Sequence, residues 1–576
     1  MFDQTWSTYA IDACLRNGVD HFFVAPGSRC TPLTLAVARD ERAQITQHYD
    51  ERGLAFCALG HGRATRKPGV FICTSGTAVA NAMPAVIEAA MDRVPLLLFT
   101  ADRPDELRGI GANQTIEQRE IFGTYPDLFF NLPAPEDQSS AEDTDGTHFL
   151  AKVLDRAISA AAVGPVHVNW IFREPFTIEE PTPGNGLPSN QPLKTTANQP
   201  RLTGAGEGND AGRSAVSLNS SVENIELTGN TLIALGSCTP DEARAAQALA
   251  VRLGCPILSD VTSGLAASSF ELPSEFTLPR PDHVLHLGDR ITSKSWIHWT
   301  ASVAGEGTDF FHITSTGQVV NPANISLHRH CFSFSELKTR VVGSTASPEF
   351  LAAWEEAEEC RRKTIDGALE STESLSEPSI AHFLHQHHPV DHGLFLGNSM
   401  PIRDMDWFGG APEHDQAIPL VRHVAANRGA SGIDGLLATA VGYANGLERP
   451  TTVLIGDLSA LHDLNSFSLV SNSATPMIIL VVNNQGGHIF DLLPIRSSPH
   501  FEQYFNTPHD YRFAGAAEMF GLPYLRATDM QSFRASYDHA LAQSRSHVIE
   551  LATDRQVNLE TRQQIRKAIR QCSDQD

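Results

Sequence analysis

Short runs of apolar residues recur along this chain, and amphipathic stretches separate them. In residues 1–180, four such runs predict buried strands: HFFVAP (21–26), GVFICTS (69–75), PLLLFTA (95–101) and GPVHVNW (164–170). The stretches between them, such as ERGLAFCALGHGRAT, carry apolar residues at helical spacing. Strands that alternate with helices are joined by right-handed crossovers, so the pattern predicts an α/β fold of doubly wound parallel sheets.

The pattern is interrupted once and then resumes twice. Residues 181–229 are rich in Pro, Gly, Asn and Ser, which predicts a linker because such a stretch buries little surface. Apolar runs return in 230–342 and again in 378–576, and a charged helical connection at 343–377 joins these two parts. We therefore expect three α/β domains with a repeated architecture.

Composition and charge limit the classes of partner. The chain has 576 residues and a formal net charge of −24, which argues against a nucleic-acid or anionic-membrane partner. No run of 18 apolar residues suggests a membrane span, and no basic segment followed by an apolar one opens the chain. Its nine cysteines have neither metal-ligand nor CxxC spacing. These features predict a cytoplasmic protein whose cysteines are mostly small buried residues.

The loops that follow the predicted strands are the candidate site, because ligands of open parallel sheets bind beyond the carboxyl ends of the strands. Any one of these loops alone is typical of a plain turn, so only the chemistry that they combine identifies a site. They are polar or glycine-rich: APGSR (25–29), TSGTA (74–78), TADRP (100–104), LGNSM (396–400), IGDLSA (455–460) and VNNQGG (482–487).

Two of these loops carry candidate metal ligands. Asp457 ends one predicted strand and Asn484 ends the next. Carboxylate and amide oxygens are the ligands that Mg²⁺ prefers, and the glycines after Asn484 allow close backbone approach. A turn aspartate and an unrelated pair of asparagines would have the same sequence. The occurrence of Asp457 and Asn484 at the ends of two successive strands favours a metal site.

This GD…NN spacing resembles the metal motif of the thiamine-diphosphate-dependent enzymes. The resemblance implies that Mg²⁺, or Mn²⁺ in its place, binds the side chains of Asp457 and Asn484 and the carbonyl of Gly486. It implies thiamine diphosphate as the cofactor, with Ser459 among its contacts. It also makes 1–180 a pyrimidine-binding domain and 378–576 a diphosphate- and Mg-binding domain. The residue after Asp457 is leucine, where the superfamily usually has glycine.

The helical stretch that begins at Glu51 carries a candidate catalytic carboxylate. On local sequence alone, Glu51 is an ordinary acidic residue at a helix N-terminus, where the helix dipole favours a negative charge. The superfamily resemblance implies instead that Glu51 contacts N1′ of the cofactor's aminopyrimidine, with Asp50 as the competing candidate. In that superfamily the two cofactor-binding domains come from different subunits. A homodimer or a dimer of dimers is therefore implied.

Five basic residues lie in or near the strand-end loops: Arg29, Arg103, Lys294, Arg403 and Arg428. Arginine binds carboxylates through paired hydrogen bonds, and five cations exceed what a small monoacid such as pyruvate requires. The set fits two dianionic substrates. For any single arginine, a structural salt bridge is an equally good interpretation.

Several of these stretches resemble the 2-succinyl-5-enolpyruvyl-6-hydroxy-3-cyclohexene-1-carboxylate (SEPHCHC) synthases, among them APGSR-x-TPLTLA, NRGASGIDGLL and NN-x-GG-x-IF-x-LLP. The resemblance implies decarboxylation of 2-oxoglutarate and addition of the resulting succinyl-semialdehyde carbanion to isochorismate, in menaquinone or phylloquinone biosynthesis. The implied substrate contacts are Ser28, Arg29, Arg103, Gln114, Lys294, Ser399, Arg403, Arg428, Phe490 and Leu493. The implied cofactor contacts include Gln114, Ser399, Ile489 and Ile433, the last as the residue that holds the cofactor bent.

Two departures from that family and two rival functions stay open. Ser295 replaces the second cation of a Lys-Arg pair, with Arg290 as a candidate substitute, and His488 replaces a glutamine and is expected to point away from the chemistry.

Another 2-oxoacid decarboxylase or carboligase would need fewer cations. A non-catalytic nucleotide-binding subunit would be expected to lose Glu51 or the predicted metal ligands. GIGANQ (109–114) lacks the third glycine of a dinucleotide fingerprint.

Overall fold

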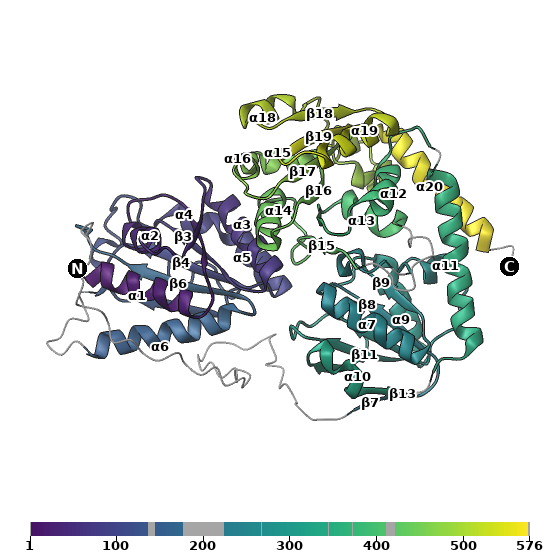
Figure 1. Cartoon of the computed structure of the whole chain (residues 1–576), viewed down its shortest axis with the longest axis horizontal. Helices are drawn as coiled ribbons and strands as arrows, with labels where there is room; N and C mark the ends of the chain where they lie inside the picture. The colour runs from purple at the N-terminus through teal and green to yellow at the C-terminus, as the bar shows by residue number, and fades with distance from the viewer. Residues whose placement is uncertain are drawn as a thin grey trace.

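A computed structural model of the chain describes residues 2–135, 144–176, 224–266, 268–343, 345–370, 372–409 and 421–573. Three sheets of five or six strands follow one another along the chain, with helices packed around them (Figure 1). The strand pairs described within these sheets are parallel. The predicted fold class, α/β with doubly wound parallel sheets, is confirmed.

The N-terminal sheet has the strand order β2-β1-β3-β4-β6-β5. All four predicted strands are present, and the sequence pattern missed β2 and β5. The strands are β1 (His21–Val24), β2 (Gln44–Gln47), β3 (Gly69–Cys73), β4 (Leu96–Asp102), β5 (Leu128–Leu132) and β6 (Pro165–Ile171). The helices are α1 (Phe2–Arg16), α2 (Thr31–Ala38), α3 (Glu51–Thr65), α4 (Thr77–Asn81), α5 (Met83–Asp92) and α6 (Thr144–Ala161).

The C-terminal sheet repeats this topology, with the order β15-β14-β16-β17-β19-β18. Its strands are β14 (Gly393–Leu396), β15 (His423–Ala425), β16 (Thr451–Gly456), β17 (Met477–Asn483), β18 (Tyr524–Ala527) and β19 (His547–Ala552). Its helices are α12 (Glu377–His387), α13 (Met400–Phe408), α14 (Leu436–Leu447), α15 (Asp457–His462), α16 (Phe467–Ser471), α17 (Phe501–Tyr504), α18 (Ala514–Met519), α19 (Met530–Leu541) and α20 (Arg555–Ser573).

The central sheet is smaller, with the order β12-β11-β10-β8-β9. Its strands are β8 (Thr231–Leu235), β9 (Ile257–Ser259), β10 (His283–Leu287), β11 (Asp309–Thr314) and β12 (His328–Cys331). Its helices are α7 (Pro240–Leu253), α8 (Leu272–Glu275), α9 (Lys294–Gly305) and α10 (Leu337–Arg340). Beside it, β7 (Ile225–Leu227) pairs with β13 (Val341–Gly343), so the end of the predicted 181–229 linker is a strand. The rest of that linker, 181–223, lies outside the described residues.

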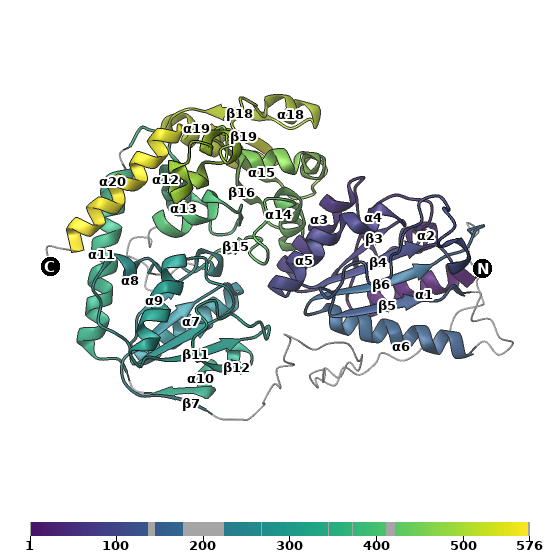
Figure 2. The same cartoon turned by 180° about the vertical axis from the view of Figure 1, so that it is seen from behind.

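Two long helices connect the central and C-terminal sheets. Residues of the predicted helical connection form α11 (Pro348–Leu369), and α20 lies along it in both views (Figures 1 and 2). A disulfide joins Cys360 of α11 to Cys572 of α20, with their Cα atoms 6.6 Å apart. The sequence spacing gave no sign of this pair. Five other cysteines are buried, as expected: Cys14, Cys30, Cys57, Cys73 and Cys255.

Helices α3 and α14 bring the N-terminal and C-terminal sheets together (Figure 1). Glycines allow their backbones to touch, because a Cβ atom on Gly60 would lie 2.0 Å from the carbonyl oxygen of Thr439. On the other helix, a Cβ atom on Gly442 would lie 1.9 Å from the carbonyl oxygen of Cys57. Apolar residues of both sheets form one continuous core around this contact. The two outer sheets are therefore packed together within a single chain.

This contact predicts that alanine has opposite effects at two helix glycines. Gly60→Ala should destabilise the protein by about 1–3 kcal/mol, because the added methyl group overpacks the α3–α14 contact. Gly367→Ala in α11 is the matched control, since no atom lies within 4 Å of its Cβ position. The control should stabilise α11 by up to about 1 kcal/mol through helix propensity. Unfolding midpoints measure both effects, and a neutral Gly60→Ala would contradict the packing described here.

Candidate active site

The predicted metal ligands lie at the carboxyl edge of the C-terminal sheet. Strands β16 and β17 are neighbours in which Gly456 pairs with Val482, so Asp457 and Asn484 emerge at the same edge. Asp457 is 3% exposed, and burial raises the pKa of its carboxyl group. Its Oδ2 accepts hydrogen bonds from the backbone amides of Gln485 (2.8 Å) and Gly486 (3.2 Å). The two loops are thus tied together through the Asp457 carboxylate.

The side chain of Asn484 presents an oxygen without a hydrogen-bond partner. Its Nδ2 donates to Glu377 at 2.7 Å, whereas its buried Oδ1 has no partner among the described residues. An orphaned amide oxygen close to a carboxylate suits a hard cation such as Mg²⁺. Among the residues that the structure describes, no three His, Cys, Asp or Glu side chains gather as metal ligands. The predicted set combines one such residue, Asp457, with the amide oxygen of Asn484 and the carbonyl oxygen of Gly486. All three are hard oxygen donors, so these residues fit the expected ion.

Close contacts fix the backbone of the loop that follows β17. A Cβ atom on Gly486 would lie 2.5 Å from the carbonyl oxygen of Asn506, so only glycine fits there without a shift. The ring of His488 bonds the carbonyl of Asn484 (2.9 Å) and the carboxylate of Asp491 (3.2 Å). His488 therefore braces the loop.

Apolar side chains stand exposed beside this edge. Ile433 is 37% exposed and Leu493 44% exposed, and Ile489 and Phe490 are half-buried in the 3₁₀ turn His488–Leu492. Ser459 is buried in the first turn of α15. Large apolar side chains left in water suit a surface that a ring-bearing ligand covers. The cofactor-contact residues predicted in this sheet are therefore compatible with the expected cofactor.

Glu51 is the first residue of α3 and belongs to the N-terminal sheet. Asp50 is the N-cap of this helix and accepts from the amides of Arg52 (3.0 Å) and Gly53 (3.4 Å). Because Asp50 is used as the cap, Glu51 is not needed for that role. It is half-buried, and its Oε2 accepts from Nδ2 of Asn81 at 3.2 Å.

The start of α3 lies against α15, the helix that Asp457 begins. Arg52 bonds the ring and the carbonyl of His462, and Asn465 donates to Asp50 at 3.2 Å. The end of α15 therefore contacts the segment that carries Glu51. The predicted catalytic carboxylate and the predicted metal ligands lie on touching elements of one chain.

Two of the predicted substrate arginines form a pair in the N-terminal sheet. Arg29 and Arg103 are 5% and 8% exposed, and burial, together with the charge of Arg103, lowers the pKa of Arg29. Arg29 donates to the carbonyl of Phe172 (2.9 Å) and to Glu174 (2.7 Å). Arg103 donates to the Ser75 hydroxyl and to the carbonyl of Gln114. Arg29 is thus ion-paired with Glu174, and Arg103, whose charge acts on Arg29, has no ion pair among the described contacts.

Other predicted residues of this sheet lie in the same loops. Gln114 has a positive φ of 54° and donates to the carbonyl of Ser75 at 2.9 Å. Ser28, next to Arg29, is exposed. The loops after β1, β3 and β4 therefore bring Ser28, Arg29, Arg103 and Gln114 into one cluster.

A second arginine pair lies in the C-terminal sheet. Arg403 donates to the carbonyl of Ser399, a residue with a φ of 75°, and Arg428 donates to Asn398 at 2.8 Å. Burial, and then the neighbouring Arg428, lower the pKa of Arg403. Two partly buried arginines that repel each other are stabilised when an anion binds between them. The outer sheets thus contribute one arginine pair each.

The fifth predicted cation is not part of either pair. Lys294 is the exposed first residue of α9, and none of the described contacts connects it with either arginine pair. Ser295 donates to Glu271 at 2.9 Å. Arg290 donates to the carbonyl of Met91 in α5 and lies 3.4 Å from Asp92, so it links the N-terminal and central sheets.

Comparisons with known proteins agree with this geometry. Two family models match: the N-terminal TPP binding domain of thiamine pyrophosphate enzymes over residues 4–121, and the C-terminal TPP binding domain over 420–551. A 2-succinyl-5-enolpyruvyl-6-hydroxy-3-cyclohexene-1-carboxylate synthase of Rubrobacter xylanophilus is 38% identical over 97% of this chain and 96% of its own length. The chain belongs to the SEPHCHC synthase family. Family members from Chlorobium phaeobacteroides (37% identical; 99% of this chain, 98% of the relative) and Salinibacter ruber (35%; 98% and 96%) match equally completely.

Membership in the SEPHCHC synthase family makes the chain an enzyme of the transferase class that uses thiamine diphosphate. The matched N-terminal range contains Glu51, Arg29 and Arg103, and the C-terminal range contains Asp457 and Asn484. In the described part of the chain, no helix has the length and apolar character to span a membrane.

Three residues at this site were not predicted. Glu88 of α5 accepts from the amides of Gly429 (2.9 Å) and Ala430 (2.7 Å), and so fixes the loop that carries Arg428. His509 lies 3.2 Å from Oδ2 of Asp457. Glu377 supports Asn484. A glutamate within the otherwise apolar stretch of α5 was a signal for Glu88, but the sequence around the other two gave none.

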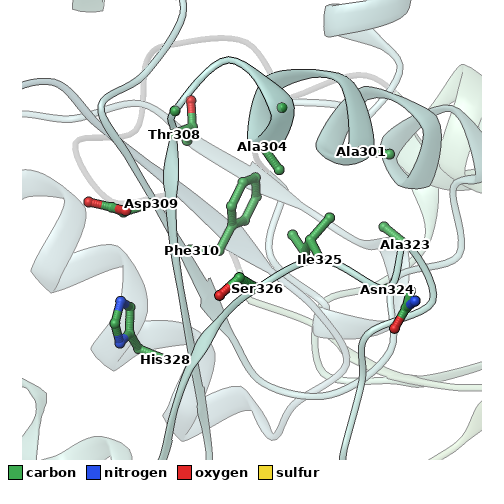
Figure 3. Close-up of a pocket in the computed structure, with 12 residues that line it drawn as sticks. Ala301, Ala304, Thr308, Asp309, Phe310, Ala323, Asn324, Ile325, Ser326 and His328 are labelled. Carbon is green, nitrogen blue, oxygen red and sulfur yellow. The ribbon is translucent and has the colours of Figure 1, made fainter.

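A separate cavity of about 470 Å³ lies in the central sheet (Figure 3). Phe310 and Ile325 project toward its middle, and Asp309 and His328 stand at one side. Of the described residues that line it, none is an arginine or a lysine. This cavity is therefore unsuited to a dianionic substrate.

The geometry predicts that Asp457→Ala weakens metal and cofactor binding together. The substitution removes the carboxylate that ties the two strand-end loops together through the amides of Gln485 and Gly486. Calorimetric titration of Mg²⁺ with thiamine diphosphate present should show about a tenfold or larger loss of affinity. Asp463→Asn, at a buried carboxylate beyond the end of α15, is the control. Unchanged affinity in Asp457→Ala would exclude the assignment.

Proposed function

We propose that this enzyme decarboxylates 2-oxoglutarate and joins the remaining four-carbon unit to isochorismate, giving SEPHCHC and CO₂ for menaquinone or phylloquinone biosynthesis. The observation that supports the proposal is that each outer sheet carries one pair of arginines whose charges interact, Arg29 with Arg103 and Arg403 with Arg428. Two dicarboxylates need four carboxylate-binding groups, and Arg29, Arg103, Arg403 and Arg428 provide that number. The names of the family members support the same reaction.

The chain's own residues have distinct tasks in this proposal. Asp457, the Oδ1 of Asn484 and the carbonyl of Gly486 would hold Mg²⁺, or Mn²⁺ in its place, and through it the diphosphate. When bound, the cofactor supplies a nucleophilic carbon and accepts the electron pair that CO₂ leaves behind. Glu51 holds a proton at the pyrimidine ring, which activates that carbon. Ile489, Phe490 and Leu493 would form an apolar wall beside it, and Ile433 would hold the cofactor bent.

The arginine pairs orient the acids and offset their charge. Because Arg103 lies in the loop after β4 with Gln114, we assign it to isochorismate, the bulkier acceptor. Arg403 and Ser399, at the start of α13, are assigned to the 2-oxoglutarate side. Arg428, Phe490 and Leu493 complete the pocket, and Ser28 lies at its exposed rim. Lys294, at the start of α9, would contact the substrates from the side of the central sheet.

The enzyme is proposed to act in the cytoplasm as a homodimer or a dimer of dimers. The superfamily resemblance supports this assembly, although α3 and α14 already meet within the chain described here. Light scattering during gel filtration should give two or four chains per particle. A particle of one chain with full activity would exclude the assembly.

The reaction is tested by incubating the enzyme with 2-oxoglutarate, isochorismate, thiamine diphosphate and Mg²⁺. Mass detection should show SEPHCHC and one CO₂ per product, in amounts that require both acids. Product formation from pyruvate with equal kcat/KM would instead favour a general 2-oxoacid carboligase.

Replacing the carboxylate of Glu51 should abolish turnover and spare cofactor binding. Glu51→Gln keeps the size of the side chain but cannot exchange a proton, so kcat should fall by at least about 100-fold. Asp50→Asn is the control, because asparagine caps a helix as well as aspartate does and turnover should persist. Exchange of the cofactor's C2 proton, followed by NMR, checks the role. A wild-type exchange rate in Glu51→Gln would refute it.

Removing Arg103 should impair the acceptor more than the donor. Loss of one buried carboxylate contact costs about 2–4 kcal/mol, so Arg103→Ala should lower kcat/KM for isochorismate by roughly two decades. Release of CO₂ from 2-oxoglutarate alone should change far less. Arg119→Ala is the control, an arginine in the same segment that is 45% exposed and pairs with Asp105. Equal losses in both steps would place Arg103 in the donor site or the scaffold.

A further inference from the structure

A buried carboxylate holds the amide of Asn484 from behind. Glu377, the first residue of α12, accepts through Oε1 from Nδ2 of Asn484 (2.7 Å) and from Nδ2 of Asn558 (2.9 Å). Arg562 of α20 donates to the other oxygen, Oε2. Glu377 and Arg562 are each 6% exposed, so water does not compete for these contacts.

The chemistry of this contact fixes which end of the amide faces the metal site. A carboxylate only accepts hydrogen bonds, so it takes the NH₂ end of Asn484 and turns the oxygen away. That oxygen is the buried atom without a partner among the described residues. We propose that Glu377 is a positioning residue that holds the Asn484 oxygen toward Mg²⁺. The proposal rests on the metal site of the proposed function.

Arg562 in turn fixes Glu377 and links it to a second helix. It binds Asp404 through two hydrogen bonds, Nε to Oδ1 (2.9 Å) and Nη2 to Oδ2 (2.6 Å). Asp404 is 1% exposed and follows Arg403 in α13. One buried arginine therefore joins the support of the metal ligand to the helix that carries a proposed substrate cation.

The same network predicts what a glutamine at position 377 would do. Its side-chain oxygen would have to face Arg562, because an NH₂ group there would oppose a positively charged donor. Its NH₂ group would then face Nδ2 of Asn484, and two donors cannot bond each other. Asn484 would turn over and present its NH₂ group to the metal. Glu377→Gln should therefore damage metal binding although it is nearly isosteric.

The test uses Mn²⁺ as the probe, bound to the full-length enzyme with saturating thiamine diphosphate and followed by electron paramagnetic resonance. Glu377→Gln should weaken Mn²⁺ binding by about 10- to 100-fold, the usual effect of losing a group that orients a metal ligand. The matched control is Glu358→Gln, the same substitution at a buried glutamate of α11 that accepts from the amide of Ser269 and has no described contact with Asn484. Its Mn²⁺ affinity should stay close to that of the wild type.

A reciprocal exchange separates positioning from a general loss of structure. In Asn484→Asp two carboxylates face each other across the former hydrogen bond, so Mn²⁺ binding should weaken. In the double variant Glu377→Gln/Asn484→Asp, the introduced glutamine can donate to the introduced aspartate, and much of the affinity should return. A double variant that binds no better than the weaker single variant would overturn the proposal.

The outcomes also distinguish a failure of this proposal from a failure of the proposed metal site. If Asp457→Ala binds Mn²⁺ as tightly as the wild type, the metal site of the proposed function is wrong. If binding depends on Asp457 but Glu377→Gln and Glu358→Gln weaken it equally, the metal site stands and the positioning role is wrong. Unfolding midpoints of all variants identify losses that come from misfolding, and recovery in the double variant would exclude that cause.

Discussion

The backbone contact between α3 and α14 is the feature on which the rest of the structure depends. Without side chains at Gly60 and Gly442, the two helices touch along their backbones, and the outer sheets share one core. Glycine within a helix costs about 0.5–1 kcal/mol relative to alanine, and the close packing offsets this cost. Close by, the start of α3, which carries Glu51, lies against α15, the helix that begins with Asp457.

Electrostatics explain how an acidic protein would bind acids. The chain carries a net charge of −24, yet each outer sheet gathers two arginines close enough for their charges to interact. Keeping like charges together in a partly buried region costs free energy, and a bound anion would recover it. The acidic surface would then contribute to solubility, while the local field of the arginine pairs would attract the substrates.

Much of the fold was predictable, because buried parallel strands are continuous apolar runs that the sequence shows directly. The missed strands include β2 (QITQ), which is mostly exposed, and β18 (YLRA), both at sheet edges. Their polar, short sequences give no such signal. The identical strand order of the two outer sheets was also hidden, since topology can repeat without a sequence repeat. The apolar residues of TAVANAMPAVIEAAM (77–91) have the spacing of a single helix, but the stretch forms two, α4 and α5, which divide at Ala82, just before Pro84.

The candidate site was predictable only where its residues lie in strand-end loops. Asp457, Asn484 and the arginines of both pairs could be located in this way. Glu377 could not, because its partner Asn484 lies 107 residues away and only the folded chain brings them together. Glu88 is a glutamate in an otherwise apolar stretch, but its partner Gly429, 341 residues away, could not be known from the sequence. Sequence also could not show that Arg290 contacts α5, or that Asp50 rather than Glu51 caps α3.

An experimental structure with thiamine diphosphate and Mg²⁺ bound tests the central claim most directly. The account predicts one cofactor between the outer sheets, with its pyrimidine ring at hydrogen-bonding distance from Glu51. The metal should lie between the diphosphate, Asp457 and the oxygen of Asn484. A cofactor bound away from Glu51, or a metal that contacts neither Asp457 nor Asn484, would contradict it.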